Sequence, residues 1–211
     1  MSYAVKEIFY TLQGEGAHAG RPAVFLRFTG CNLWTGLQRD RLQGPGGCSR
    51  WCDTDFVGGN RFRSAADLFA AVARHWPKSP PSPVQPFVVC TGGEPLLQLD
   101  APLLAEFAAA GWFVAVETNG TIDPPAGDLW LTVSPKAGTD LVVLQGNELK
   151  LVFPQVGAEP ERFAHLAFQH FFLQPMDTAA KTENTLSALE YCLAHPQWRL
   201  SLQTHKILNI R

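Results

Sequence analysis

Three of the five cysteines, Cys31, Cys48 and Cys52, lie in a segment rich in glycine and arginine rather than in an apolar pattern. Such surroundings offer no core to join, so burial as small hydrophobic residues does not explain them. Three thiolates could bind zinc with a fourth ligand, or three irons of a 4Fe–4S cluster whose fourth iron stays open. No histidine lies near them in the sequence to complete a zinc site, which favours the open, reactive cluster.

The other two cysteines fit the protein core. Cys90 lies inside an apolar strand pattern, and Cys192 lies on the apolar face of a predicted helix. A buried free cysteine packs as a small hydrophobic residue. We therefore expect that neither of them replaces a member of the first group.

The composition is typical of a globular intracellular protein. In 211 residues, 17 Lys and Arg nearly balance 19 Asp and Glu, and 46% of the residues are hydrophobic. This balance excludes a disordered chain and a strongly basic nucleic-acid binder. The apolar runs, such as 86–90, are too short to cross a bilayer, and the first ten residues lack the pattern of a signal peptide. We expect a cytoplasmic protein, in which clustered cysteines bind metal more often than they form disulfides.

Short apolar runs separated by helical patterns predict strands that alternate with helices, and so a mostly parallel sheet. The expected strands are 22–28, 87–90, 113–116, 129–133, 149–153, 170–173 and 198–202, and the expected helices are 65–75, 102–110, 160–166 and 184–194, with a short one around 35–42. Ser64 is the candidate N-cap of the first helix. The proline-rich segment 77–86 predicts an exposed connector, because proline cannot join helix or strand interiors. No second hydrophobic pattern asks for its own core, which predicts a single domain of residues 1–211.

Polar or glycine-rich signatures directly follow four of the expected strands. They are T-G-G-E-P at 91–95, E-T-N-G at 117–120, S-P-K at 134–136 and Q-P-M-D at 174–177. The carboxyl ends of parallel strands meet at one edge of a sheet, where ligands usually bind. Cys31 ends an earlier strand and belongs to the same edge. The sequence therefore predicts an enzyme whose site is assembled from the whole chain.

The clustered cysteines followed by G-G-E-P and E-T-N-G resemble the radical S-adenosylmethionine enzymes. A fuller set of segments is similar to the 7-carboxy-7-deazaguanine synthase family. It comprises Y-T-L-Q-G-E-G at 10–16, F-L-R-F-T-G-C-N-L-W at 25–34, C-D-T-D-F at 52–56, V-V-C-T-G-G-E-P at 88–95, S-P-K at 134–136, L-Q-P-M-D at 173–177 and Q-T-H-K-I-L-N-I at 203–210. These segments run in order from one end of the chain to the other, so the resemblance covers nearly all of it.

The resemblance implies an α/β fold, a truncated βα barrel of about six parallel strands. It implies the conversion of 6-carboxy-5,6,7,8-tetrahydropterin to 7-carboxy-7-deazaguanine, a ring contraction that releases ammonia and belongs to queuosine biosynthesis. The implied cofactors are a 4Fe–4S cluster, S-adenosyl-L-methionine and Mg²⁺. An electron from the cluster cleaves S-adenosylmethionine, and the resulting radical takes a hydrogen from the substrate. The implied partners are an electron donor such as flavodoxin and a second copy of the chain in a homodimer.

By the same resemblance, Cys31, Cys48 and Cys52 are the cluster ligands, and the hydroxyl of Thr54 reaches Mg²⁺. Sixteen residues separate the first two cysteines and three separate the last two, where the family commonly has about fourteen and two. An extra residue between the second and third thiols alters their relative direction. Magnesium keeps several waters and needs few protein ligands, so a single threonine is chemically reasonable. A loop hydroxyl bonded to its own backbone is the structural alternative.

The resemblance also assigns contacts to the two small molecules. The S-adenosylmethionine contacts are Trp51, Cys52, Asp53, Gly93, Glu94, Glu117, Asn119, Ser134, Pro135, Lys136, Gln174, Pro175, Met176 and Asp177. The substrate contacts are Leu12, Gln13, Gly14, Glu15, Arg27, Thr91, His205 and Arg211. The fork of a guanidinium suits a carboxylate at Arg27, although this side chain could instead face solvent. His205 is expected near the end of the last strand, where it either bonds the substrate or is structural.

Two other functions stay open at this point. A different radical S-adenosylmethionine enzyme, such as a glycyl-radical activase, would need a docking surface for a protein and would leave 10–16 and 203–206 unexplained. A non-catalytic zinc protein would use the three cysteines structurally. A brown protein after anaerobic purification would indicate the iron cluster, and a colourless protein with stoichiometric zinc would indicate the structural site.

Overall fold

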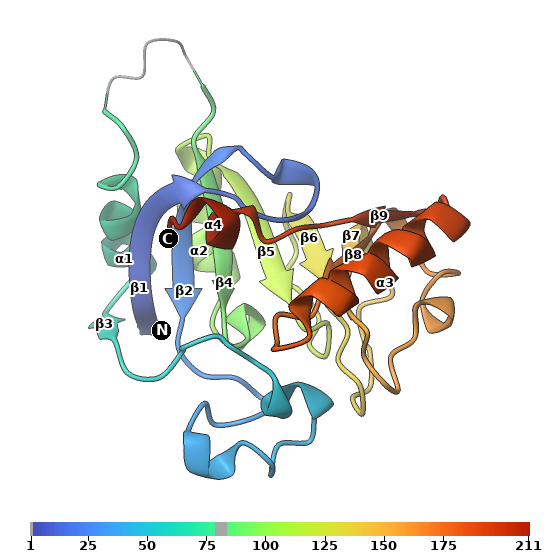
Figure 1. The fold of residues 1–211 in the computed structure, drawn as a ribbon. Helices are drawn as coiled ribbons and strands as arrows, with labels where there is room; N and C mark the ends of the chain where they lie inside the picture. The colour runs from blue at the N-terminus through green and yellow to red at the C-terminus, as the bar shows by residue number, and fades with distance from the viewer. Residues whose placement is uncertain (1, 79–83) are drawn as a thin grey trace.

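The computed structural model describes residues 2–78 and 84–211, in which nine strands form one sheet (Figure 1). The strands are β1 (Tyr3–Leu12), β2 (Pro22–Phe28), β3 (Asn60–Phe62), β4 (Phe87–Gly92), β5 (Phe113–Thr118), β6 (Trp130–Val133), β7 (Gln145–Phe153), β8 (Ala167–Pro175) and β9 (Trp198–Leu200). Their spatial order is β3-β1-β2-β4-β5-β6-β7-β8-β9. β1 is antiparallel to β2 and β3, whereas β2 and β4 to β9 run parallel. No pairing among the described residues joins β3 to β9, so the barrel is incomplete, as the sequence predicts.

In the described residues, four α-helices accompany the sheet: α1 (Ala65–Ala73), α2 (Ala101–Ala109), α3 (Lys181–Ala194) and α4 (Thr204–Leu208). The Ser64 side chain caps α1 by accepting a hydrogen bond from the Asp67 amide at 3.1 Å, which confirms the predicted N-cap. α1 packs against α2 through the edge-to-face rings of Phe69 and Phe107. α3 packs against β8 and β9, and the short α4 crosses in front of β2 and β4 (Figure 1). The helices therefore cover the sheet unevenly.

Alternate residues of β4 are buried on opposite faces of the sheet. Val88 and Cys90 belong to the main core, whereas Phe87 and Val89 join a smaller cluster with Ala23. A parallel strand covered on both faces reads as a continuous apolar run, which is why β4 was predictable. Cys90 is fully buried and Cys192 is partly buried against the main core, so both fit the core role expected of them.

Most predicted elements match the structure to within a few residues, and three predictions are wrong. The helix expected at 160–166 is only a 3₁₀ turn, Pro160–Arg162, because β8 begins at Ala167 and leaves too few residues for a stable helix. The helix expected around 35–42 is likewise only the 3₁₀ turn Gln38–Asp40. His205 lies on α4 and not at the end of a strand. The central part of the predicted connector at 77–86, residues 79–83, lies outside the described residues.

The antiparallel strands β1 and β3 were not anticipated. The register of β1 against β2 shifts between Val5 and Glu7. Such a bulge interrupts the alternation of buried and exposed side chains by which a strand is recognised. Within the described residues, every helix is too short or too polar to span a membrane.

Candidate active site

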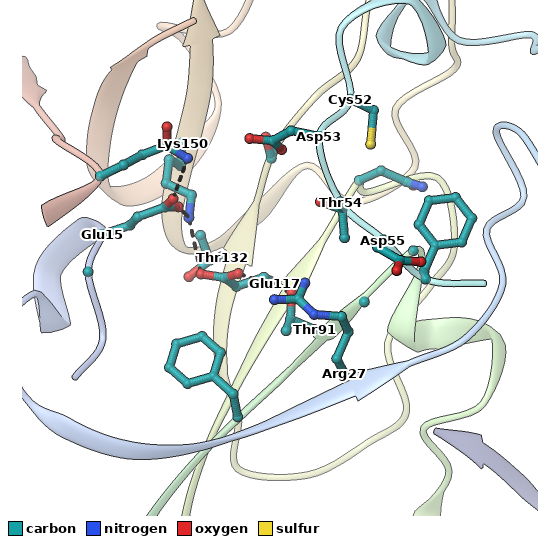
Figure 2. Close-up of a pocket in the computed structure, with 18 of the residues that line it drawn as sticks. Glu15, Arg27, Cys52, Asp53, Thr54, Asp55, Thr91, Glu117, Thr132 and Lys150 are labelled. Atoms are coloured by element: carbon teal, nitrogen blue, oxygen red, sulfur yellow. Dashed lines mark hydrogen bonds and ion pairs between the residues drawn. The ribbon is translucent and has the colours of Figure 1, made fainter. Parts of the chain in front are cut away.

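A cavity of about 400 Å³ lies at the carboxyl edge of the parallel strands. Its lining comes from β1, β2 and β4 to β8, from the segment between β2 and β3, and from α4. In Figure 1 the arrows of β2, β4, β5 and β6 all point toward the segment that carries the three clustered cysteines. Figure 2 shows side chains from distant segments, among them Glu15, Thr91 and Lys150, directed into the shared space. The predicted assembly of one site from both ends of the chain is therefore present.

The three clustered cysteines line this cavity together. Cys48 is buried in a short 3₁₀ turn, Gly47–Arg50, and Cys31 and Cys52 are half-buried. The Cys52 amide donates to the Cys48 carbonyl at 2.7 Å, so four residues of chain make one helical turn between the two thiols. Burial raises the pKa of Cys48 to about 11, and burial also raises the pKa of Cys31.

The residues around these thiols fit an iron–sulfur cluster better than a single metal ion. Among the described residues, no group of three His, Cys, Asp or Glu side chains is arranged to hold one ion. A 4Fe–4S cluster presents a separate iron to each thiolate, so its three cysteine thiols can lie farther apart than the ligands of a single metal ion. At Gly93 a Cβ atom would lie 2.1 Å from the Gly30 carbonyl oxygen and 2.8 Å from the Cys31 Cβ. Glycine is therefore required where the end of β4 meets the first cysteine.

Lys136, from S-P-K after β6, brings a positive charge to the cysteines. Its Nζ donates to Ser134 Oγ at 2.6 Å and lies 5.6 Å from the centre of the Trp51 ring. Loss of solvent lowers the pKa of Lys136, and the neighbouring Cys48 and Cys52 oppose that shift. A cation at this position suits a site that gathers three thiolates.

Glu94 is fully buried and lies behind the cavity wall rather than in it. One carboxylate oxygen accepts from the Leu96 amide at 3.0 Å and the Thr118 hydroxyl at 2.8 Å, and the other accepts from the Asn119 amide at 2.8 Å. Burial raises the pKa of Glu94, while these donors oppose the shift. The Glu94 carboxylate thus ties the ends of β4 and β5 together.

Lys150 lies between two carboxylates and is only 5% exposed. Its Nζ bonds to Glu15 and lies 3.1 Å from Glu117 Oε1 (Figure 2). Burial alone would lower the pKa of Lys150, but Glu117 and Glu15 outweigh it and the pKa is raised. Burial would likewise raise the pKa of Glu117, but Lys150 outweighs it and the pKa is lowered. The three groups therefore form an ion-pair cluster in which one buried lysine lies between two partly buried carboxylates.

Neutral side chains complete the bonds of this cluster. Gln13 and Thr91 each donate to Glu117 at 3.2 Å, and Gln174 and Gln203 donate to Glu15 at 3.2 and 3.0 Å. Within the described residues, the buried Oε1 of Gln174 has no hydrogen-bond partner. A buried acceptor without a partner is unfavourable, so this oxygen is suited to a ligand N–H or O–H group. The cavity wall around β7 is rich in acceptors.

Two arginines share one carboxylate at another part of the cavity. Arg27 Nε lies 2.9 Å from Glu7 Oε1, and Arg211 bonds to the other oxygen of Glu7. The Arg211 guanidinium lies 4.8 Å from the centre of the Phe9 ring, which is stacked on Phe25 at 5.3 Å. This part of the lining combines aromatic surface with a net positive charge.

The residues that follow Cys52 supply oxygen atoms to the cavity. Asp53 is paired with Lys206 at 2.6 Å, and Asp55 is paired with Lys6 at 2.7 Å. Thr54 lies between them and lines the cavity (Figure 2). Mg²⁺ prefers oxygen donors and keeps several waters, so the Thr54 hydroxyl, whose neighbouring carboxylates are paired with lysines, is suited to it as a single protein ligand.

α4 contacts the cavity from the carboxyl end of the chain. Lys206 lies 2.6 Å from Asp53 and 2.5 Å from Asp177, which joins α4 to the cysteine segment and to the end of β8. His205 faces Gly14, where a Cβ atom would lie 2.3 Å from the His205 Nδ1 atom. Burial lowers the pKa of His205. The close approach of α4 therefore depends on glycine at that position.

The structure brings most of the predicted site residues into the cavity lining. These are Leu12, Gln13, Gly14, Glu15, Arg27, Cys31, Cys48, Trp51, Cys52, Asp53, Thr54, Thr91, Gly93, Glu117, Asn119, Ser134, Lys136, Gln174, His205 and Arg211. Five predicted residues lie outside the lining: Glu94, Pro135, Pro175, Met176 and Asp177.

Sequence reasoning missed Glu7, Lys150, Gln203 and Lys206 as lining residues. Lys150 carried a signal, because a lysine inside the apolar run L-K-L-V-F is expected to be paired when buried. Glu7 carried none, because β1 itself was not anticipated. Its position opposite Arg27 follows only from the strand register.

Comparison with known proteins gives full-length relatives. The chain is 58% identical to the 7-carboxy-7-deazaguanine synthase of Bordetella pertussis and 56% identical to that of Caulobacter vibrioides, over the whole of each chain. The crystal structure of QueE from Escherichia coli superposes with a TM-score of 0.72 at 29% identity, covering 96% of this chain and 94% of that one. No family model matches the chain.

An incomplete parallel barrel with three cysteines at its carboxyl edge, matched over nearly its full length to QueE, defines a radical S-adenosylmethionine enzyme. Within that class, the chain belongs to the 7-carboxy-7-deazaguanine synthase family.

Proposed function

We propose how this chain performs the 7-carboxy-7-deazaguanine synthase activity of queuosine biosynthesis, the ring contraction of 6-carboxy-5,6,7,8-tetrahydropterin. The observation that carries the proposal is that the cysteines, the Glu15–Lys150–Glu117 cluster and the paired arginines all line one cavity. A cavity of about 400 Å³ is within the range that binds small molecules. The whole chain, built on one sheet, works as a single domain.

Cys31, Cys48 and Cys52 hold the 4Fe–4S cluster, and the strand ends around Gly93, Ser134 and Lys136 receive S-adenosylmethionine beside it. When bound, these groups supply the radical that takes a hydrogen from the substrate. The chain's own contribution is to position the substrate carbon and to exclude water from it. Glu94 contributes indirectly, because it fixes the ends of β4 and β5 that carry the contacts.

The acceptor-rich wall binds the hydrogen-bond donors of the pterin. Glu15 and Glu117 are both paired with Lys150, and each carboxylate accepts from the N–H groups along the edge of the ring. The unpartnered Oε1 of Gln174 accepts one more, which makes a substrate role at least as suitable for Gln174 as contact with S-adenosylmethionine. Oriented acceptors at one edge fix which carbon faces the cluster side of the cavity.

The arginines bind the carboxylate of the pterin. Arg27 uses only its Nε in the pair with Glu7, which leaves its terminal N–H groups for a fork with a carboxylate. Arg211 adds a second guanidinium near the same place, held by the other oxygen of Glu7. The stacked Phe9 and Phe25 rings lie beside them and offer apolar surface to the flat ring system.

Thr54 provides the protein oxygen for Mg²⁺, since its neighbours Asp53 and Asp55 are engaged with lysines. By the same resemblance, an electron donor such as flavodoxin would reduce the cluster, and two copies of the chain would form a homodimer. The position of Thr54 in the cavity lining supports its role toward Mg²⁺.

A reconstituted-enzyme assay tests the proposal. The anaerobically loaded protein is incubated with the carboxytetrahydropterin, S-adenosylmethionine, reductant and Mg²⁺, and both 5′-deoxyadenosine and 7-carboxy-7-deazaguanine are measured. We expect both products, with a lower rate when Mg²⁺ is omitted and a further loss in Arg27→Ala. Formation of 5′-deoxyadenosine without the deazaguanine would retain the radical class and reject the assigned substrate.

A further inference from the structure

One tight turn of the chain joins Cys48 to Cys52, and both cysteines line the cavity. The turn is 3₁₀ over Gly47–Arg50, and Cys52 comes just after its C-terminal cap, Trp51, so the direction of the Cys52 thiol depends on how the end of the turn is held. The Cys48 carbonyl accepts from the Trp51 amide at 3.0 Å and from the Cys52 amide at 2.7 Å. An isolated turn of this length is unstable by itself and leaves its last carbonyls unpaired. Something outside the turn must hold it.

Arg41 supplies that support from the preceding segment. Its Nη1 donates to the Ser49 carbonyl at 3.1 Å and to the Cys52 carbonyl at 3.1 Å. These are carbonyls of the turn that no later helical amide could satisfy. A guanidinium at the carboxyl end of a helical turn also interacts favourably with its dipole.

Arg41 is itself held in place. Its Nε donates to Gln38 Oε1 at 2.9 Å, and its guanidinium lies 4.9 Å from the centre of the Trp34 ring. Trp34 is buried and packs edge-on against Phe56. The segment between Cys31 and Cys48 is therefore a braced support for the turn, in which Trp34 and Gln38 orient Arg41.

The neighbouring Arg39 shows that not every arginine between Cys31 and Cys48 is held against the turn in this way. Its side chain is 79% exposed, and its ion pair, with the adjacent Asp40, is 3.7 Å long. Two arginines in the same turn region thus have different surroundings, and only Arg41 reaches the backbone of a cysteine.

We propose that Arg41 is a positioning residue for the iron–sulfur cluster: it fixes the Cys48–Cys52 turn and so sets the direction of the second and third thiols. The inference rests on the proposed role of the three cysteines as cluster ligands. Loss of the Arg41 side chain leaves all three thiols in the chain but lets the turn fray, so the third thiolate binds its iron less firmly. Groups that orient metal ligands in this way typically change metal affinity by about tenfold or more.

The test compares Arg41→Gln with Arg39→Gln as the matched control, each reconstituted anaerobically with iron and sulfide. Iron per chain, the electron paramagnetic resonance spectra of the oxidised and reduced protein and the rate of iron loss to a chelator are measured. We expect Arg41→Gln to lose iron about tenfold faster and to show three-iron species, while Arg39→Gln behaves as wild type. Arg41→Lys, which keeps the charge and loses the planar fork, is expected to lie between them.

A coupling experiment separates support of the turn from a general loss of stability. Deleting Arg50, an exposed residue of the turn, shortens the spacing to two residues and removes the present bond from the Cys52 amide to the Cys48 carbonyl. In that background, Arg41→Gln is expected to add little to the rate of iron loss. Equal iron content, spectra and loss rates in Arg41→Gln and Arg39→Gln would overturn the inference alone. A wild-type chain that loads no iron would instead overturn the proposed function.

Discussion

At the scale of single residues, Lys150 shows most clearly how charge is organised in the cavity. A buried lysine between Glu15 and Glu117 satisfies two carboxylates that would otherwise repel each other at low solvent exposure. Removing one partner of a buried ion pair leaves uncompensated charge and is far more costly than removing an exposed pair. The Glu15–Lys150–Glu117 cluster is therefore a structural element of the cavity wall as well as the acceptor surface proposed for the substrate.

We expect Lys150→Met to lower the free energy of unfolding of the chain without its iron–sulfur cluster by about 3–5 kcal/mol, as for other broken buried pairs. Urea unfolding followed by circular dichroism measures the change. The matched control is Lys6→Met, which removes an exposed pair with Asp55 and should cost about 1 kcal/mol or less. Adding Glu15→Gln to Lys150→Met should recover part of the loss. Similar losses of unfolding free energy in the two lysine variants would show that Glu15, Lys150 and Glu117 do not form a stabilising ion-pair network.

His205 provides a second prediction at this scale, in the dependence of stability on pH. Burial lowers its pKa below the ordinary value of 6.5, so the unfolded chain binds this proton more readily than the native chain. The contribution of neutral His205 is present above pH 6.5 and is lost as the pH falls from there toward the lowered pKa. Thermal melts from pH 5 to pH 8 should therefore show a smaller acid loss in His205→Asn than in wild type. Parallel curves would contradict the burial of this imidazole.

At the scale of elements, the sequence predicted the parallel strands well because β2 and β4 to β6 are continuous apolar runs ending in polar signatures. It predicted the shared edge for the same reason, since parallel strands end together. It did not predict β1, whose bulge breaks the alternation, or α4, whose five residues are too few to give a helical period. Both omissions matter for the site. Glu7 lies on β1, and Lys206 and His205 lie on α4.

The ion pairs of Lys206 make α4 a support for two other segments of the site. Lys206→Gln breaks the bonds to Asp53 and Asp177, so the contact of α4 with the cysteine segment and the end of β8 weakens. We expect a KM for S-adenosylmethionine raised about two- to fivefold, the range of partly exposed ion pairs, with kcat less affected. Steady-state kinetics measures both constants. Lys181→Gln is the control, because it also contacts Asp177 but lies on α3. An unchanged KM in Lys206→Gln would show that α4 closes the site without this lysine.

At the scale of the whole molecule, the site joins segments that are far apart in the chain. Residues of β1 and the cysteine segment meet the ends of β4 to β8, and α4 closes the assembly from the other end of the sequence. In the part of the chain that the structure describes, the sheet does not close between β3 and β9, so its two edges are not held together by backbone pairing. A ligand that contacts several strand ends must therefore stabilise the fold as well as occupy the site.

S-adenosylmethionine should accordingly raise the melting temperature of the cluster-loaded enzyme. At a concentration of about 100 times Kd, ligand binding adds about 2.7 kcal/mol. For a chain of this size, that corresponds to a shift of about 5–11 °C in the melting temperature. Anaerobic scanning calorimetry measures the shift, with adenosine as the control ligand, because it lacks the methionine part that we propose lies beside the cysteines. Removing iron and sulfide should reduce the shift, since the ligand then loses its contacts beside Cys31, Cys48 and Cys52. An equal shift with and without the iron–sulfur cluster would place S-adenosylmethionine away from the cysteines and contradict the proposal that both bind in one cavity.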